Sequence, residues 1–281
     1  MKIKKNSKWR ATAVLLLLIL LSFSGRAQEG HRVFTFKPGE VYEKDILINS
    51  NAIVQRGQQN LRVNTVSDLS KRYTVQLANE RGTTFNVKIT RMENEIDALG
   101  QKLVFNSAEK NDTTSRIVKA LHFMVDKPVD VQVNNYGIIQ SYTDYKAEMA
   151  TDTLVSFAGI QPEAFEKGTM LNILADFSYN ADLKKNFSWT DSVEIDRQRL
   201  ITRFWVEDIN ENVTIIKFSS KISTKLLNSN QNGTYVIDNA TGLILEKILY
   251  TISTGYQISA GGVIYAVSRS TSVSERSRRV K

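Results

Sequence analysis

Histidine is the side chain best suited to acid–base chemistry near neutral pH, and the 281-residue sequence contains only two. His31 lies close to the start of the chain, where termini are usually mobile. His122 lies within the apolar run 120–125, which is typical of a buried structural histidine rather than a general base. The sequence also has no cysteine, which excludes thiol nucleophiles and thiolate metal sites. We therefore assign no catalytic residue, no metal ligand and no cofactor site.

Acidic side chains form the next candidate site. Arg91, Glu93, Glu95 and Asp97 are spaced two apart, so they would share one face of an extended strand. Glycoside hydrolysis needs two carboxyl groups that face each other across a sugar, whereas this row runs along a single strand. The row is more typical of a solvated strand that discourages edge-to-edge association. A carboxylate-dependent, glycosidase-like hydrolase is therefore not the leading interpretation, and it is kept as the alternative function.

Residues 208–212 carry oxygen-bearing side chains at alternate positions, as a calcium-binding loop does. Val213 and Ser219 occupy the two positions where that loop requires glycine and glutamate. We therefore interpret the segment as a hairpin turn. The sequence also lacks the glycine-rich patterns of phosphate and dinucleotide sites.

Aromatic side chains are frequent in the C-terminal half of the sequence. Trp189, Trp205 and Tyr256 could stack on a glycan or line an apolar ligand cavity. The same residue types also fill ordinary hydrophobic cores, so these three are candidates for a ligand-binding face rather than an assigned site.

The N-terminal segment has the pattern of a secretory signal peptide. Five basic residues and no acid in 1–10 precede an apolar run over 11–23, and small residues follow at Gly25 and Ala27. This pattern predicts a signal peptide over 1–27, cleaved between Ala27 and Gln28. The alternative is an uncleaved anchor, but the apolar run is shorter than the roughly 20 residues that span a bilayer. We expect a periplasmic or secreted protein with no transmembrane segment after signal removal.

The formal net charge of +8 would by itself suggest a nucleic-acid or anionic-membrane partner. Six of the 37 basic residues and none of the 29 acidic residues precede Gln28, so the remaining chain carries only +2. The stretch 269–281 contains five basic residues and one acid, and we predict a flexible basic tail there. The body over 28–268 is then slightly acidic, which argues against nucleic acid as a partner.

The body of the sequence is dominated by alternating apolar and polar residues. The alternation over 73–77 and 85–90, on either side of the turn 79–82, predicts a hairpin of half-buried strands. The same signals predict hairpins around the turns 134–137 and 238–242. Residues 182–199 are polar and charged, and they fit either an extended loop or an edge strand.

Two helices are predicted in the middle of the chain. Apolar residues recur at three- and four-residue spacing over Asp144–Phe157, and Pro162 fits the first turn of a second helix over Pro162–Asp176. The predicted fold class is therefore α+β and mainly β. We expect a single domain, 28–268, built on a long, curved, half-barrel-like antiparallel sheet with the two central helices packed on one face.

Several short motifs carry a family resemblance. They are the Ala27-Gln28 junction, the opening Pro38–Tyr42, the segment Ala120–Ile139 and the turn Asp238–Gly242. Together they resemble an uncharacterised family of exported proteins from Bacteroidetes-type bacteria, which carries a domain of unknown function. The layout is also similar to the lipoprotein-carrier half-barrels, which hold acyl chains between a curved sheet and a helical lid. This second likeness concerns architecture only.

The resemblance to exported bacterial proteins implies O-glycosylation at Thr113, Thr153 and Ser192, each of which follows an aspartate. Taken together, the sequence favours a non-enzymatic protein of the cell envelope. We expect it to bind an apolar, lipid-like ligand, a glycan, or a cell-envelope protein.

Overall fold

The computed structural model describes residues 31–109, 115–125, 127–143, 165–177, 183–195, 198–223, 227–258 and 264–281. The predicted signal peptide, 1–27, and the predicted helix over 144–157 lie outside these ranges. Within them the chain is mainly β, as predicted. Its elements are β1 (Val41–Arg56), β2 (Gln59–Asn79), β3 (Gly82–Ala98), β4 (Gln101–Asn106), α2 (Arg116–Met124), β5 (Val129–Val133), β6 (Ile139–Tyr142), β7 (Ser188–Ile195), β8 (Gln198–Ile209), β9 (Val213–Ser223), β10 (Leu227–Asp238), β11 (Ile244–Ile258) and β12 (Ile264–Arg279).

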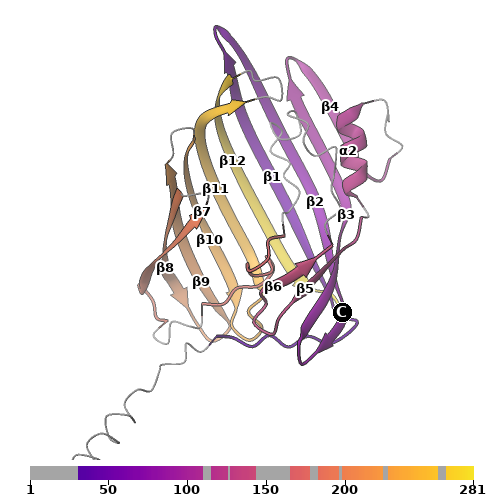
Figure 1. Cartoon of the computed structure of the whole chain (residues 1–281), viewed down its shortest axis with the longest axis vertical. Coiled ribbons are helices and arrows are strands. Elements are labelled where there is room, and N and C mark those ends of the chain that lie inside the picture. Colours follow the sequence, from indigo (N-terminus) through magenta and orange to yellow (C-terminus); the bar gives the residue numbers. More distant parts are fainter. Residues whose placement is uncertain are drawn as a thin grey trace, which may run out of the picture.

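All the strands belong to one open antiparallel sheet. Its order is β6-β5-β3-β2-β1-β12-β11-β10-β9-β8-β7, and β4 pairs with β3 beside this path. Most strands pair with a neighbour in sequence, but β1 and β12, the first and the last strand, pair at the centre from Tyr42–Arg279 to Gln55–Ala266. In Figure 1 this seam runs down the middle of the sheet, with the indigo β1 beside the yellow β12. The seam joins the two halves of the chain into one sheet.

The predicted hairpins are confirmed. β2 and β3 meet across the turn at 80–81, β5 and β6 across 134–138, and β10 and β11 across 239–243. The segment 208–212 is part of the β8–β9 hairpin, where the Asn210 side chain accepts hydrogen bonds from the backbone of Asn212 and Val213. Of the segment 182–199, residues 188–195 form the edge strand β7, and 183–187 before it form a loop with a turn.

The prediction of a helix over 162–176 is wrong in its described part. Residues 165–177, called the strap below, form turns and isolated bridges. The strap hydrogen-bonds to two hairpins: Leu171 N–H donates to the Gly137 carbonyl, and Ile244 N–H donates to the Ile173 carbonyl. Its internal backbone bonds form single turns rather than a helix, from Thr169 N–H to the Glu166 carbonyl and from Leu174 N–H to the Leu171 carbonyl. Gly168, at φ 89°, also lies outside helical geometry. Apolar spacing alone could not reveal these distant backbone partners.

The strap shows how strongly the sheet curves. Met170 bridges Ile138 just before β6, and Leu174 bridges Leu243 just before β11. The four residue steps from Met170 to Leu174 span at most roughly 14 Å, and the two bridges add roughly 5 Å each, so the strap reaches at most roughly 24 Å from one hairpin to the other. On a flat sheet β6 and β11 would lie roughly 29 Å apart, because six strand spacings separate them. The sheet must therefore curl at this end, and Figure 1 shows β5, β6 and the strap in front of the central strands.

Two clusters of the core lie on the concave face. The first lies under the strap, where Tyr73 and Phe85 from the sheet pack with Leu171 and Ile173. The second lies under α2, a helix that the sequence analysis did not predict. Val118 and Leu121 of α2, three residues apart on one face, pack there around Phe105.

Residues 269–279 belong to β12, where the sequence analysis expects a flexible basic tail. Outward-facing arginines of β12 pair with acids of the neighbouring strands: Arg278 with Glu43 and Asp45, and Arg276 with Glu246. The basic charge of this stretch is therefore matched across the sheet by carboxylates that are remote in sequence.

Candidate functional site

A cavity of about 590 Å³ lies on the concave face of the sheet, within the range of roughly 300–1,000 Å³ that is typical of ligand sites. Its wall comes from six adjacent strands, β3, β2, β1, β12, β11 and β10. Met124 at the end of α2 and Asn172 of the strap complete the described part of the wall. The concave sheet, the helix and the strap therefore line one space.

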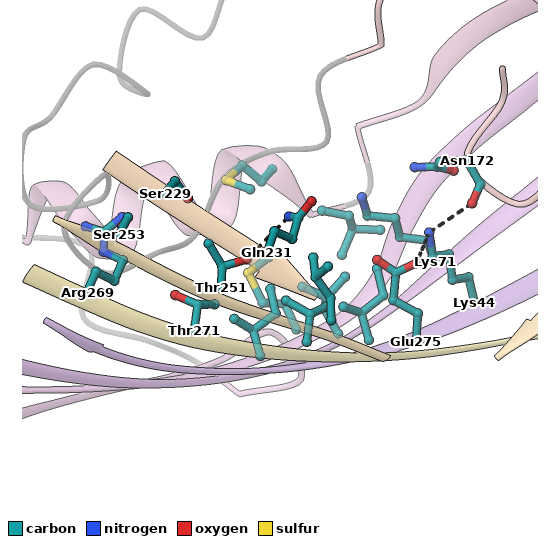
Figure 2. Close-up of a pocket in the computed structure, with 18 of the residues that line it drawn as sticks. Lys44, Lys71, Asn172, Ser229, Gln231, Thr251, Ser253, Arg269, Thr271 and Glu275 are labelled. Atoms are coloured by element: carbon teal, nitrogen blue, oxygen red, sulfur yellow. Dashed lines mark hydrogen bonds and ion pairs between the residues drawn. The ribbon is translucent and has the colours of Figure 1, made fainter. Parts of the chain in front are cut away.

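Charged side chains gather at the strap end of the cavity, as Figure 2 shows. Lys44 on β1 and Lys71 on β2 are directly opposite in the register, and both side chains are buried. Lys44 Nζ lies 2.6 Å from Glu275 Oε2 and 3.4 Å from the Asn172 carbonyl oxygen. Glu275 Oε1 lies 3.4 Å from Lys247 Nζ. The Glu275 carboxylate thus pairs with both Lys44 and Lys247, and Lys71 lies beside Lys44.

The strap fixes this charged end through Asn172. The Tyr73 hydroxyl donates to Asn172 Oδ1 over 2.9 Å, which leaves the amide Nδ2 as a donor group at the same end. On the β10 side, burial raises the pKa of Tyr235 to about 12, and the nearby Glu275 carboxylate adds to the rise. Tyr235 therefore stays a neutral hydroxyl across the physiological pH range.

The middle of the cavity is apolar. The residues that follow the charged end along each strand are aliphatic or methionine: Ile46, Ile48, Leu69, Met92, Leu249 and Val273. Methionine has a flexible, polarisable side chain that adapts to irregular apolar partners. This part of the wall can bury an apolar group without leaving polar atoms unpaired.

The far end is polar again. Thr251, Thr271, Gln231 and Ser253 line it together with Arg269, whose pKa is lowered by burial. Gln231 Nε2 donates to the Thr251 hydroxyl over 3.3 Å. From Glu275 to Arg269 the cavity follows six residues of β12, roughly 20 Å at the usual rise of a strand. The cavity is therefore a long slot that is charged, then apolar, then polar.

The structure separates the three aromatic candidates. Trp189 of β7 stacks on Phe204 of β8 at 5.2 Å, inside an aromatic cluster away from the slot. Trp205 follows Phe204 and so points to the opposite face of β8. Tyr256 is exposed on β11. No common aromatic ligand face forms among these residues.

The acidic row of β3 faces outward and is paired with bases. Arg91 contacts both Asp68 at 2.5 Å and Glu93 at 3.3 Å, while Glu95 contacts Lys102 at 2.8 Å. The row has β2 on one side and β4 on the other, so it lies inside the sheet rather than at an edge.

The two histidines also lie outside the slot. His122, on α2, packs its ring edge-on against the ring of Phe105, and the two ring centroids lie 5.0 Å apart. His31 Nδ1 lies 3.3 Å from the buried carboxylate of Asp176, which also accepts a hydrogen bond from Arg32 N–H. This contact docks the N-terminal segment onto the strap, where the sequence analysis expects a mobile end.

Of the three glycosylation candidates, Ser192 is exposed on the edge strand β7, while Thr113 and Thr153 lie outside the described residues. The described ranges contain no group of three His, Asp or Glu that could hold a metal ion. No helix in the described part of the chain is long and apolar enough to cross a membrane.

The sequence analysis missed the residues at the charged end of the slot. Lys44 and Lys71 occupy inward positions of strands whose alternation is otherwise apolar: Tyr42, Lys44 and Ile46 share one face of β1. A lysine in register with core residues is a signal that a search for catalytic motifs passes over.

No protein-family model matches the sequence. No curated protein matches it either. Among solved structures, the chain is similar to lipovitellin, in a structure concerned with lipid–protein interactions, at 14% identity and a TM-score of 0.49 over 88% of this chain and 26% of that chain. The chain thus spans about a quarter of the length of lipovitellin.

Two bacterial proteins are similar at lower scores. An outer-membrane channel from Pseudomonas putida F1 matches at 7% identity and a TM-score of 0.27, over 88% of this chain and 98% of that one. OccK7 (OpdD) from Pseudomonas aeruginosa matches at 7% identity and a TM-score of 0.26, over 88% of this chain and 100% of that one.

Proposed function

We propose that this chain is an exported, non-enzymatic protein of the cell envelope and that its concave slot binds a lipid-like ligand. The signal-peptide pattern of 1–27 supports export. The observation that carries the ligand proposal is the apolar middle of a cavity of about 590 Å³, bordered by polar groups at both ends. Such a wall suits an amphipathic molecule better than a sugar, whose hydroxyl groups need partners along their whole length.

Apolar burial supplies the affinity in this proposal. Transfer of apolar surface from water contributes about 25 cal/mol per Å². An acyl chain laid along Ile48, Leu249 and Val273 would bury one side of its surface against aliphatic side chains. The polar groups at the two ends would then set its orientation rather than its affinity.

A pair of neighbouring substitutions tests the proposal. Ile48 faces the slot, whereas Leu47 is 43% exposed on the other face of β1. We expect Ile48→Trp to fill the middle of the slot and to reduce binding of a fluorescent long-chain acyl probe at least tenfold. Leu47→Trp adds the same side chain outside the slot and should leave binding unchanged.

Native mass spectrometry of wild-type protein from its own host completes the test. We expect a copurified lipid in the wild type and in Leu47→Trp, and little or none in Ile48→Trp. A wild-type protein that carries no lipid and binds no acyl probe would overturn the proposal, as would equal probe binding by both variants.

A further inference from the structure

A row of uncharged polar side chains crosses the concave face toward the far end of the slot. Its members lie directly opposite one another on the six adjacent strands from β1 to β8, so they share one face of the sheet. They are Ser50, Thr271, Thr251, Gln231, Ser220 and Thr202. Thr271, Thr251 and Gln231 line the slot itself. The lining therefore changes from apolar to polar at this row.

Two serines extend the polar surface beyond this row. Ser229 and Ser253 lie directly opposite each other on β10 and β11, and both line the slot. Figure 2 shows them with Gln231, Thr251 and Thr271 at one end of the cavity. These five residues, called the polar patch below, carry four hydroxyl groups and one amide. A hydroxyl group and an amide can each both donate and accept hydrogen bonds, so the patch can hold a neutral group that does the same.

Much of the hydrogen-bonding capacity of the polar patch is unused within the described part of the chain. Gln231 Nε2 donates to Thr251 Oγ1 over 3.3 Å, and the Thr271 hydroxyl lies 3.1 Å from that of Ser50. The amide of Gln231 keeps a second N–H and its carbonyl oxygen, and the Thr251 hydroxyl keeps its own hydrogen. Polar groups on a partly buried surface are stabilised by partners. A ligand with donors and acceptors of its own would supply them.

The strap end is less suited to a head group, because its charges are already matched within the chain. Lys44 and Lys247 contact Glu275, and Lys71 has an interaction of its own. A charged head group would compete with these contacts, whereas the polar patch offers hydrogen bonds without breaking an ion pair. Arg269, which lies beside the patch, also has an interaction within the chain.

The apolar lining continues across the seam from the polar patch. The patch belongs to β10, β11 and β12, whereas β1, β2 and β3 supply the aliphatic and methionine side chains Ile46, Ile48, Leu69, Ile89 and Met92. We infer that the ligand is a neutral amphiphile whose hydroxyl-bearing head group binds the polar patch, with its apolar chain over β1, β2 and β3. A monoacylglycerol has this chemistry. The inference rests on the proposed function and adds the class of the head group.

Three probes with the same acyl chain test the inference on the delipidated full-length protein: a monoacylglycerol, the methyl ester and the free fatty acid. The first two share the chain and the ester group and differ in the two hydroxyl groups of glycerol. We expect the monoacylglycerol to bind about tenfold more tightly than either of the others, the effect of one or two hydrogen bonds. If the methyl ester or the fatty acid binds as tightly, the inference fails while the proposed function stands. If none of the three binds, both fail.

Variants of the polar patch then assign the preference to it. Thr251→Val and Gln231→Met remove hydrogen-bonding atoms and keep a side chain of similar size. We expect each to reduce the preference for the monoacylglycerol about fivefold, while methyl-ester binding persists and shows that the variant is folded. Thr251→Ser keeps the hydroxyl group and should retain the preference. Thr254→Val makes the same replacement on the exposed outward face of β11 and should change neither affinity. An unaltered preference in both Thr251→Val and Gln231→Met would overturn the inference.

Discussion

At the scale of single residues, the slot depends on charges that are buried together. The side chains of Lys44 and Glu275 are 2% and 12% exposed, and their charged atoms lie 2.6 Å apart. Removing one partner of a buried ion pair leaves an uncompensated charge, which costs far more than loss of a pair at the surface. The pair also joins β1 to β12, since its two residues lie on opposite sides of the central seam.

We expect Lys44→Met to lower the free energy of unfolding by about 3 kcal/mol, near the lower end for a broken buried pair, because Lys247 remains beside Glu275. Equilibrium unfolding in urea measures the change. Lys102→Met removes a lysine from an exposed pair with Glu95 and should cost less than about 1 kcal/mol. Equal losses in the two variants would contradict the distinction.

Two carboxylates on the outward face of the seam make the stability of the fold depend on pH. A hydrogen bond from Arg72, with further support from Arg278, lowers the pKa of Glu43. Burial acts to raise the pKa of Asp45, but hydrogen bonds from Ser70 and Arg278 outweigh it and the pKa is lowered. A carboxyl group with a lowered pKa stabilises the fold above its unfolded-state pKa, and this stability is lost as pH falls through the folded-state pKa.

We therefore expect stability to fall as pH drops below about 4.3, the ordinary pKa of a glutamate. Arg278→Gln should be less stable than the wild type at pH 7 and should lose less stability between pH 7 and pH 3. Urea unfolding at both pH values measures this difference. Arg81→Gln, in the exposed β2–β3 turn, serves as the control and should follow the wild-type profile. Parallel profiles for the wild type and Arg278→Gln would disprove the linkage.

The alternation of the sequence predicts part of the charged end of the slot but not all of it. The period of two places Lys44 on the same face as Tyr42 and Ile46, so its inward position follows from local pattern. Its partner Glu275 comes from the other end of the sequence, and only the pairing of β1 with β12 brings them together. Local patterns do not specify which distant strand becomes a neighbour, so the charged end could not be predicted.

At the scale of elements, the strap holds one end of the sheet closed. It bridges the β5–β6 and β10–β11 hairpins, and the N-terminal Phe34 packs close to Gly137 and Gly242 in the two turns. Both hairpins were predictable, because glycine and asparagine mark their turns. The strap was not, because its apolar residues are spaced like those of a helix while the partners that hold it to the two hairpins lie elsewhere in the chain.

Gly242 and Gly57 provide a matched pair for testing the closure. Both have positive φ, 73° and 58°, so alanine is strained at each, by about 1–2 kcal/mol. A Cβ at Gly242 would also lie 2.7 Å from the Phe34 ring, whereas Gly57 has open space. We expect Gly242→Ala to be less stable than Gly57→Ala by a further 1–3 kcal/mol, roughly the cost of overpacking. Equal melting temperatures would show that the turn does not pack as described.

At the scale of the whole molecule, the sheet is two arrays of sequence-local hairpins joined at one seam. β12 pairs with β1 on one side and with β11 on the other, so it completes both arrays. Composition predicted a flexible basic tail here. The alternation of inward Thr271, Val273 and Glu275 with outward serines and arginine is the pattern of a strand, and net charge obscured it.

We expect deletion of residues 269–281 to abolish the cooperative fold, because it exposes long edges of β1 and β11 that then favour association between chains. Circular dichroism and size-exclusion chromatography would show loss of the thermal transition and aggregation. A truncation after Arg279 keeps all of β12 and should remain folded and monodisperse. A stable, monodisperse protein lacking 269–281 would refute the central role of β12.

The seam between the first and the last strand also sets the timing of assembly. β1 emerges early in synthesis but gains its second neighbour only when the final sixteen-residue strand has been made. Until then its backbone N–H and C=O groups on that side have no partner strand, and proteases or binding factors that recognise extended chain can engage them. Closure of the seam therefore requires β12, and a chain that ended before this strand would leave that edge of β1 exposed.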